Sequence, residues 1–137
     1  METEGQFAPA TAEAARDRYE AVGSTAQVVV KEVAKAMGLD GEEYRERVTG
    51  DVVETARDAL FAESLAVTVG TRAEFEDWRA DADHEVTVLG SEHVDGVVWH
   101  APAFADEAVA ATFQDEREAA VGTLRRQAFG RIYSEVV

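Results

Sequence analysis

Ser91, His93 and His100 are the residues whose types and spacing best suit chemistry in this sequence. If Asp95 and Gly96 form a two-residue hairpin turn, Ser91 pairs with His100, and His93 lies on the diagonal, about 7–8 Å away. A histidine can activate a serine hydroxyl, and His93 and His100 could bind a metal ion with a borrowed carboxylate. One alternative is therefore a small His-based or metal-dependent hydrolase.

The same residues also fit a solvated hairpin face without catalytic function. No HExxH or other close metal spacing supports the site, and a slip of one residue in the register would separate Ser91 from His100. The phosphate-binding loop GxxxxGK[ST], the dinucleotide motif GxGxxG and the hydrolase motif GxSxG are also absent. We therefore expect no cofactor and favour a non-catalytic protein.

Residues Ser24 to Val48 have a pattern typical of a helix-turn-helix, with Ala34 followed four residues later by Gly38. The second helix of such a unit would present Tyr44, Arg45 and Arg47 to DNA. That helix, GEEYRERV, also carries three glutamates against its two arginines. Because affinity for DNA depends on neutralising phosphates, a DNA-binding regulator is an alternative that the charge disfavours.

The composition is strongly acidic, with 28 Asp and Glu against 13 Lys and Arg and a net charge of -15. Only two of the basic residues are lysines, and 25 Ala and 19 Val stand against 5 Leu and 1 Ile. In molar salt the Debye length falls to about 3 Å, so repulsion between surface carboxylates is largely screened. This composition is typical of a protein from a salt-filled, halophilic cytosol.

Several classes of protein are excluded or disfavoured. The sequence contains no cysteine, which excludes disulfides, thiolate nucleophiles and Cys-ligated metal clusters. The first residues, METEGQFAPA, lack the basic and apolar regions of a signal peptide. No run approaches the roughly 18 apolar residues that a membrane span requires. We expect a cytoplasmic protein that does not enter a membrane.

Periodicity predicts a single α+β domain over residues 10–137, preceded by a short tail at 1–9. An N-terminal cluster of helices is expected, with Gly23 and Gly38 ending the first two. Asp95-Gly96 predicts the hairpin within a small, mainly antiparallel, three-stranded sheet. The predicted helices cover residues 11–22, 25–37, 41–48 and 72–80, and a further helix opens at Thr49 or Asp51 and continues through the stripe from Val52 to Leu60. The predicted strands cover 65–69, 84–93 and 97–100.

Residues 104–133 predict one long C-terminal helix packed on this sheet. A stripe recurs at spacings of four and seven and consists of Val109, Phe113, Ala120, Leu124, Ala128 and Ile132. A straight helix of about 30 residues would be about 45 Å long and would overhang a globule of this size. Either the helix breaks near Gly122 or Gly130, or it projects into a protein partner. A homodimer formed through the C-terminal helix would bury the overhang.

Two long segments carry a resemblance to known sequences. The segments from TAQVVVKEV to FAESL (25–65) and from VVWHAPAF to RIY (97–133) resemble an uncharacterised protein family of halophilic archaea. The resemblance covers most of the chain and implies no catalytic residues. With the composition, it predicts a non-catalytic, halophilic protein that acts through protein–protein contacts.

Overall fold

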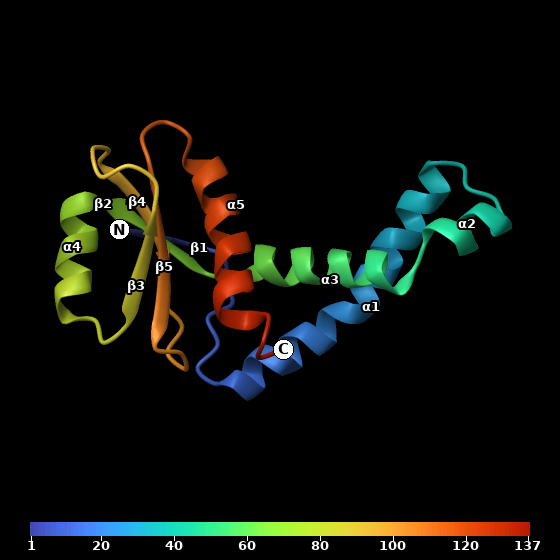
Figure 1. The fold of residues 1–137 in the computed structure, drawn as a ribbon, viewed down its shortest axis with the longest axis horizontal. Helices are drawn as coiled ribbons and strands as arrows, with labels where there is room; N and C mark the ends of the chain where they lie inside the picture. The colour runs from blue at the N-terminus through green and yellow to red at the C-terminus, as the bar shows by residue number, and fades with distance from the viewer.

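The computed structural model describes all residues, 1–137, as a mixed α+β body with a helical arm projecting from it (Figure 1). The helices are α1 (Ala12–Ala36), α2 (Gly41–Arg47), α3 (Gly50–Ser64), α4 (Arg72–Asp81) and α5 (Arg117–Ala128), and a π-helical turn (Phe129–Tyr133) continues α5. The strands are β1 (Glu2–Glu4), β2 (Val67–Thr71), β3 (Glu85–Leu89), β4 (Gly96–His100) and β5 (Glu107–Phe113). The α+β class is confirmed.

The sheet has five strands in the order β1-β2-β4-β5-β3, rather than the three that were predicted. Helix α4 covers one face and α5 covers the other (Figure 1). On the α4 face, Phe75 packs with Val97, Trp99 and Ala110. On the α5 face, Leu124 belongs to a larger cluster that continues into the base of the arm. The sheet is therefore buried from both sides at its centre.

Part of the predicted C-terminal helix is wrong, because Glu107–Phe113 forms the strand β5. The four residues from Ala108 to Ala111 are all buried. A strand covered on both faces needs apolar residues at every position, so it shows no alternation. The alanine-rich composition of this run is typical of a helix, although the run forms an interior strand of the sheet. The actual C-terminal helix is too short to overhang the body.

The two-residue hairpin at Asp95-Gly96 is also wrong. Strand β3 pairs in parallel with β5, and β4 pairs antiparallel with β2 and β5, so β3 and β4 are not neighbours. Gly90, with φ of +98°, ends β3, and residues 91–95 form a loop that leads to β4. The Asp95-Gly96 pair lies at the start of β4, but it does not indicate which strands pair with β4.

Helix α1 is one helix of 25 residues and does not end at Gly23 as predicted. Glycine inside a helix costs about 1 kcal/mol relative to alanine, which packing can offset. A Cβ at position 23 would lie 3.1 Å from the guanidinium carbon of Arg57, so glycine here lets that side chain approach α1. Gly38, with φ of +73°, follows the end of the helix as expected.

The N-terminal residues, expected to be a tail, contribute β1 to the edge of the sheet beside β2. Arg117 of α5 donates to Glu2 and to Glu4 at 2.6 and 2.9 Å. The terminal ammonium of Met1 lies 2.8 Å from Glu74 at the start of α4. These contacts attach the short strand to both helices of the body.

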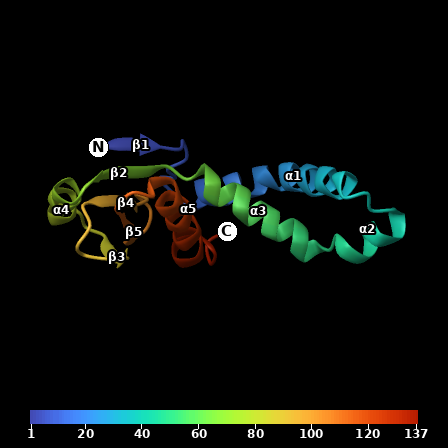
Figure 2. The same cartoon turned by 90° about the horizontal axis from the view of Figure 1, so that it is seen from above.

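The arm consists of the distal part of α1, all of α2 and most of α3, and we define it as residues 23–60. It extends well beyond the sheet in both views (Figures 1 and 2). Asp40 begins α2 with a capping box, accepting from the backbone of Glu42 and Glu43 at 3.0 and 2.9 Å. None of the helices combines the length and the hydropathy that a membrane-spanning segment requires.

Leu124 tests the packing of α5 on the sheet. Its side chain is fully buried, and the substitution Leu124→Ala is expected to lower the free energy of unfolding by about 2–5 kcal/mol. Chemical denaturation of both proteins measures the change, with the exposed Gln127→Ala on the same helix as the control. A loss below about 0.5 kcal/mol would show that α5 does not form the core described above.

Candidate functional site

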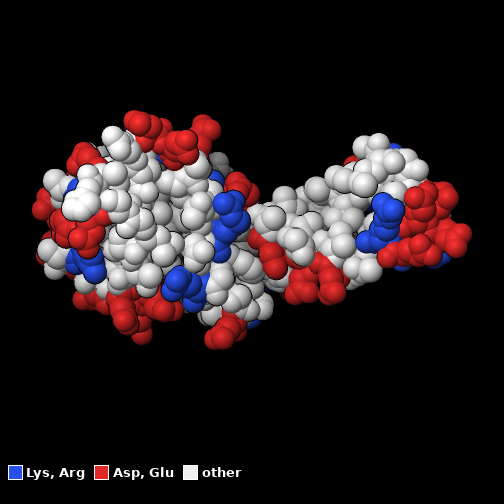
Figure 3. Space-filling view, turned by 45° about the horizontal axis from the view of Figure 1, so that its top comes forward, with Lys and Arg blue, Asp and Glu red and all other residues white.

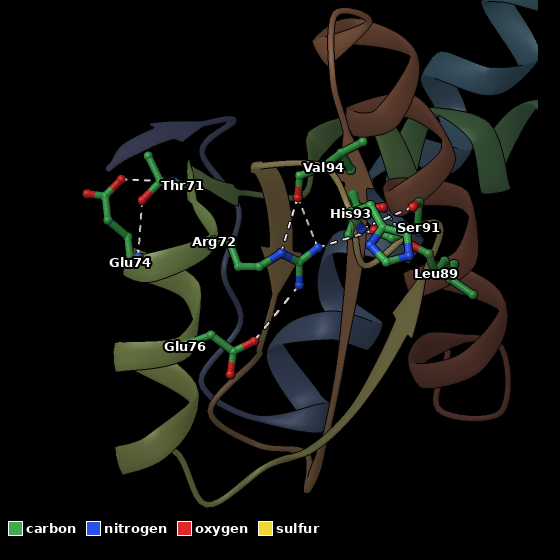
Figure 4. Close-up of polar contacts among 9 residues, drawn as sticks. Thr71, Arg72, Glu74, Glu76, Leu89, Ser91, His93 and Val94 are labelled. Carbon is green, nitrogen blue, oxygen red and sulfur yellow. Dashed lines mark hydrogen bonds and ion pairs between the residues drawn. The ribbon is translucent and has the colours of Figure 1, made fainter.

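Ser91 and His93 lie together in the exposed loop before β4, where they support the backbone and do not form a serine–histidine pair (Figure 4). The backbone N–H of His93 donates to the Ser91 hydroxyl oxygen at 3.1 Å. Arg72 fixes the same loop from α4, because it donates to the carbonyl oxygens of Val94 at 3.1 Å and Ser91 at 3.2 Å. These hydrogen bonds account for the conformation of the loop, and none of them joins the Ser91 hydroxyl to the His93 ring.

His100 lies at the other end of β4 and is only 3% exposed. Its Nδ1 lies 2.7 Å from the carbonyl oxygen of Ala66, and its Nε2 lies 2.7 Å from the Tyr133 hydroxyl. A carbonyl can only accept, so Nδ1 carries the hydrogen and Nε2 accepts from Tyr133. Burial lowers the pKa of His100 and raises the pKa of Tyr133. Both groups are neutral and fully hydrogen-bonded inside the core.

The structure therefore does not bring the three candidate catalytic residues together. His100 points into the core from the last residue of β4, whereas Ser91 and His93 precede its first residue. Both ring nitrogens of His100 already have partners in the protein. The candidate metal ligands His93 and His100 are separated in the same way, and no group of three His, Asp or Glu residues converges to hold a metal ion.

The residues proposed to contact DNA lie on α2, at the end of the arm. Tyr44 is 36% exposed, and Arg45 and Arg47 are exposed. The glutamates of this helix are at the same end, and Figure 3 shows acidic atoms gathered at the tip of the arm. The turn and the two helices that the sequence predicted are present. The local charge remains unfavourable for a phosphate backbone.

The feature that sequence reasoning missed is the exposed apolar surface of the arm. Apart from Met1, all the large hydrophobic side chains that are exposed lie between residues 28 and 52, namely Val28, Val29, Val33, Met37, Tyr44 and Val52. A concentration of exposed apolar side chains in one part of a fold is typical of a binding surface. The spacing of Val29, Val33 and Met37 at intervals of four residues is present in the sequence, but the same spacing is typical of a helix face that packs against a core.

We call Val29, Val33 and Met37 the α1 stripe. They follow one another at intervals of four residues and are 40%, 52% and 61% exposed. At 100° per residue, Thr25 and Ala36 lie on the same side of the helix, whereas Lys31 lies about 160° away from both Val29 and Val33. The three stripe residues and these two neighbours are uncharged, and Glu32, about 60° from Val29, borders the stripe on the side of Ala36.

The arm is fixed where it joins the body. The Tyr19 hydroxyl of α1 donates to Asp58 of α3 at 2.6 Å, and Arg57 Nε donates to the Tyr19 carbonyl at 2.7 Å. The Arg57 guanidinium also lies 4.3 Å from the centre of the Tyr19 ring. Burial and the hydrogen bond to Asp58 raise the pKa of Tyr19 to about 12. These contacts hold α1 and α3 together at the base of the arm.

The buried state of His100 predicts a pH dependence of stability. In the unfolded chain the imidazole binds a proton with an ordinary pKa of about 6.5, whereas folding holds it neutral. The stabilising contribution is therefore complete above pH 6.5 and is lost as the pH falls towards the lowered pKa, by up to about 1.4 kcal/mol per pH unit. Urea unfolding at pH 7.5, 6.5 and 5.5 measures the loss.

His100→Gln is the comparison, because it removes the titrating group and retains polar atoms. The variant is expected to be less stable at pH 7.5 and to lose less stability than the native protein on acidification. The carboxylates titrate in both proteins, so the difference between the slopes isolates His100. Parallel pH dependences would contradict a neutral, buried His100.

Comparison with known proteins gives a family and no activity. No curated protein and no solved structure matches the chain. The model of a family of unknown function matches residues 6–134, a range that includes the arm, the whole of α4 and α5, and strands β2 to β5. The chain therefore belongs to that family of unknown function, DUF5809.

Proposed function

We propose that the protein is a non-catalytic protein-interaction module that works as a homodimer, with the α1 stripe of each copy as the interface. The observation that carries this proposal is the restriction of exposed large hydrophobic side chains to the arm, Met1 excepted. The body provides no comparable surface. The stripe predicted for a C-terminal dimer helix is mostly buried against the protein itself, including Leu124 and Ile132.

The weak internal packing of the arm supports a need for a partner. Between residues 23 and 60 the only buried residues are Ala26 and Ala34. A methyl group removes little apolar area from water, so these two residues stabilise the helix contacts only modestly. Pairing with a second helical hairpin would cover the valines and give the arm a core of larger side chains. Four-helix arrangements are built in this way.

The α1 stripe is compatible with a second copy as the partner, although two chains of charge -15 repel one another. The stripe residues are uncharged, so an interface centred on Val33 is apolar at its middle. An antiparallel arrangement of two α1 helices also keeps the acidic bodies at opposite ends. Figure 3 shows acidic atoms over the body, along the lower edge of the arm and at its tip, whereas the upper part of the arm is largely white.

We further propose that the surface is adapted to a cytosol of molar salt. The chain has an excess of 15 negative charges and contains only two lysines, Lys31 and Lys35. Few of its carboxylates form ion pairs. Screening at high salt relieves the repulsion between them, while their hydration keeps the surface in solution. The number of carboxylates on the surface therefore indicates a solvent of high salt concentration.

Val33→Glu is expected to abolish the dimer. In an antiparallel pair centred on Val33, the two glutamates would face each other in the apolar interface, which opposes association. Light scattering coupled to gel filtration in 2 M KCl should give the mass of a dimer for the native chain and of a monomer for the variant. Ala73→Glu on the exposed surface of α4 adds the same charge and should leave the dimer intact. A native monomer at 100 µM would refute the proposal.

The absence of cysteine allows the geometry of the dimer to be tested with the single substitution Val33→Cys. In an antiparallel pair centred on this position, the two introduced thiols would face each other across the twofold axis. A disulfide requires Cα atoms no more than about 7 Å apart, so the variant should form a covalent dimer under mild oxidation, as seen on a non-reducing gel. Ala73→Cys should remain monomeric on the same gel. Equal cross-linking of both variants would argue against this interface.

The salt proposal predicts a loss of stability on dilution of KCl. As the concentration falls from 2 M to 20 mM, the Debye length grows from a few ångströms to more than about 20 Å, and the carboxylates repel one another across the fold. Thermal unfolding followed by circular dichroism is expected to give a lower Tm at 20 mM. The monomeric Val33→Glu variant should show the same trend, which separates folding from association. A Tm independent of salt would contradict the proposal.

A further inference from the structure

A groove lies on the arm away from the α1 stripe. Two adjoining cavities of about 540 and 580 Å³ share Gln27, Gly50 and Val53 along their walls. One cavity runs towards the base of the arm, where Tyr19 and Arg57 line it. The other reaches Tyr44 of α2 at the tip. Together they form a continuous depression between α1 and α3.

The charge of this groove is opposite to that of the chain. Its lining carries two cations, Lys31 and Arg57, and one carboxylate, Glu54, while the whole chain has a net charge of -15. No ion pair of the structure includes either cation, although 28 acidic residues are present. Arg57 is held over the Tyr19 ring, which positions its guanidinium at one end of the groove.

The middle of the groove is apolar and has room for side chains. Val28, Val48 and Val53 line the cavity nearer the tip, together with the half-exposed ring of Tyr44. Gly50 contributes no side chain, and a Cβ added at this position would find no atom within 4 Å. A ligand that fits must therefore combine apolar groups for the centre with negative groups for the ends.

We propose that this groove binds an acidic, amphipathic segment of another protein, with its apolar side chains against Val28 and Val53 and its carboxylates at Lys31 and Arg57. Docking of an amphipathic segment between two helices is a common mode of peptide recognition. The repulsion from the acidic body is long-ranged and screened by salt, whereas the contacts in the groove are local. Recognition of an acidic segment by an acidic protein therefore depends on this groove.

The site is independent of the proposed dimer interface, because Lys31 and Val33 project from nearly opposite sides of α1. One arm can bind a second copy through the stripe and an acidic segment through the groove. A dimer would then hold two such segments together. Failure of one of these proposals leaves the other open to its own test.

The experiment uses a fluorescein-labelled, 16-residue synthetic peptide with leucines at helical spacings of three and four and glutamates elsewhere. Fluorescence anisotropy in 0.5 M KCl measures its binding to the native protein, and saturable binding in the micromolar range is expected. Gly50→Leu fills the groove at a position with open space and should weaken binding at least tenfold. Lys31→Glu reverses the charge at one end of the groove and should weaken binding by a similar factor.

Matched controls test whether binding depends on the groove itself. Replacing the leucines of the peptide by serine should abolish binding, and Ala73→Glu, on the exposed surface of α4, should bind the original peptide as the native protein does. Circular dichroism of Gly50→Leu should show unchanged helix content. The proposal is overturned if the native protein does not bind the peptide, or if Gly50→Leu and Lys31→Glu bind it as tightly as the native protein.

Discussion

The fold depends on an aromatic cluster around Phe61, where the arm joins the body. Phe61 is fully buried, and its ring centre lies 5.1 Å from that of Tyr133 and 5.7–5.8 Å from those of Phe7, Tyr19 and Phe129. These rings come from the N-terminal segment, α1, α3 and the C-terminal turn, so one side chain connects four parts of the chain. Tyr133 also donates to His100, which extends the same contact into the sheet.

The local features of the fold could be predicted from the sequence more reliably than the pairing of its strands. Asp40 and Thr71 each begin a helix with a capping box, which a sequence can indicate because it is a contact between residues three positions apart. The position of β5 could not be predicted in this way. Its alanines are helix formers by intrinsic propensity, and only the helices on both faces of the sheet make Ala108–Ala111 a strand. Such burial is a tertiary effect that the local pattern does not contain.

The candidate site differed from expectation for a related reason. The sequence placed Ser91 and His100 on one hairpin, but the register of a hairpin depends on which strands are neighbours, and β5 lies between β3 and β4. His100 became a buried structural residue because its partners, Ala66 and Tyr133, are 34 and 33 positions away. The apolar spacing of the arm was readable, yet whether a stripe faces a core or solvent depends on the crossing of helices.

The small side chains of the core and the acidic surface lead to the same conclusion about where this protein can interact. A sheet centred on alanine and valine allows α4 and α5 to pack closely, and its surface is covered by carboxylates that oppose contact with another acidic chain. The exposed valines of the arm, with Met37 and Tyr44, are the apolar side chains that the fold leaves uncovered. The arm carries carboxylates as well, but the α1 stripe itself is apolar. The proposed interface therefore uses apolar side chains of the arm and leaves the carboxylates of the body in water.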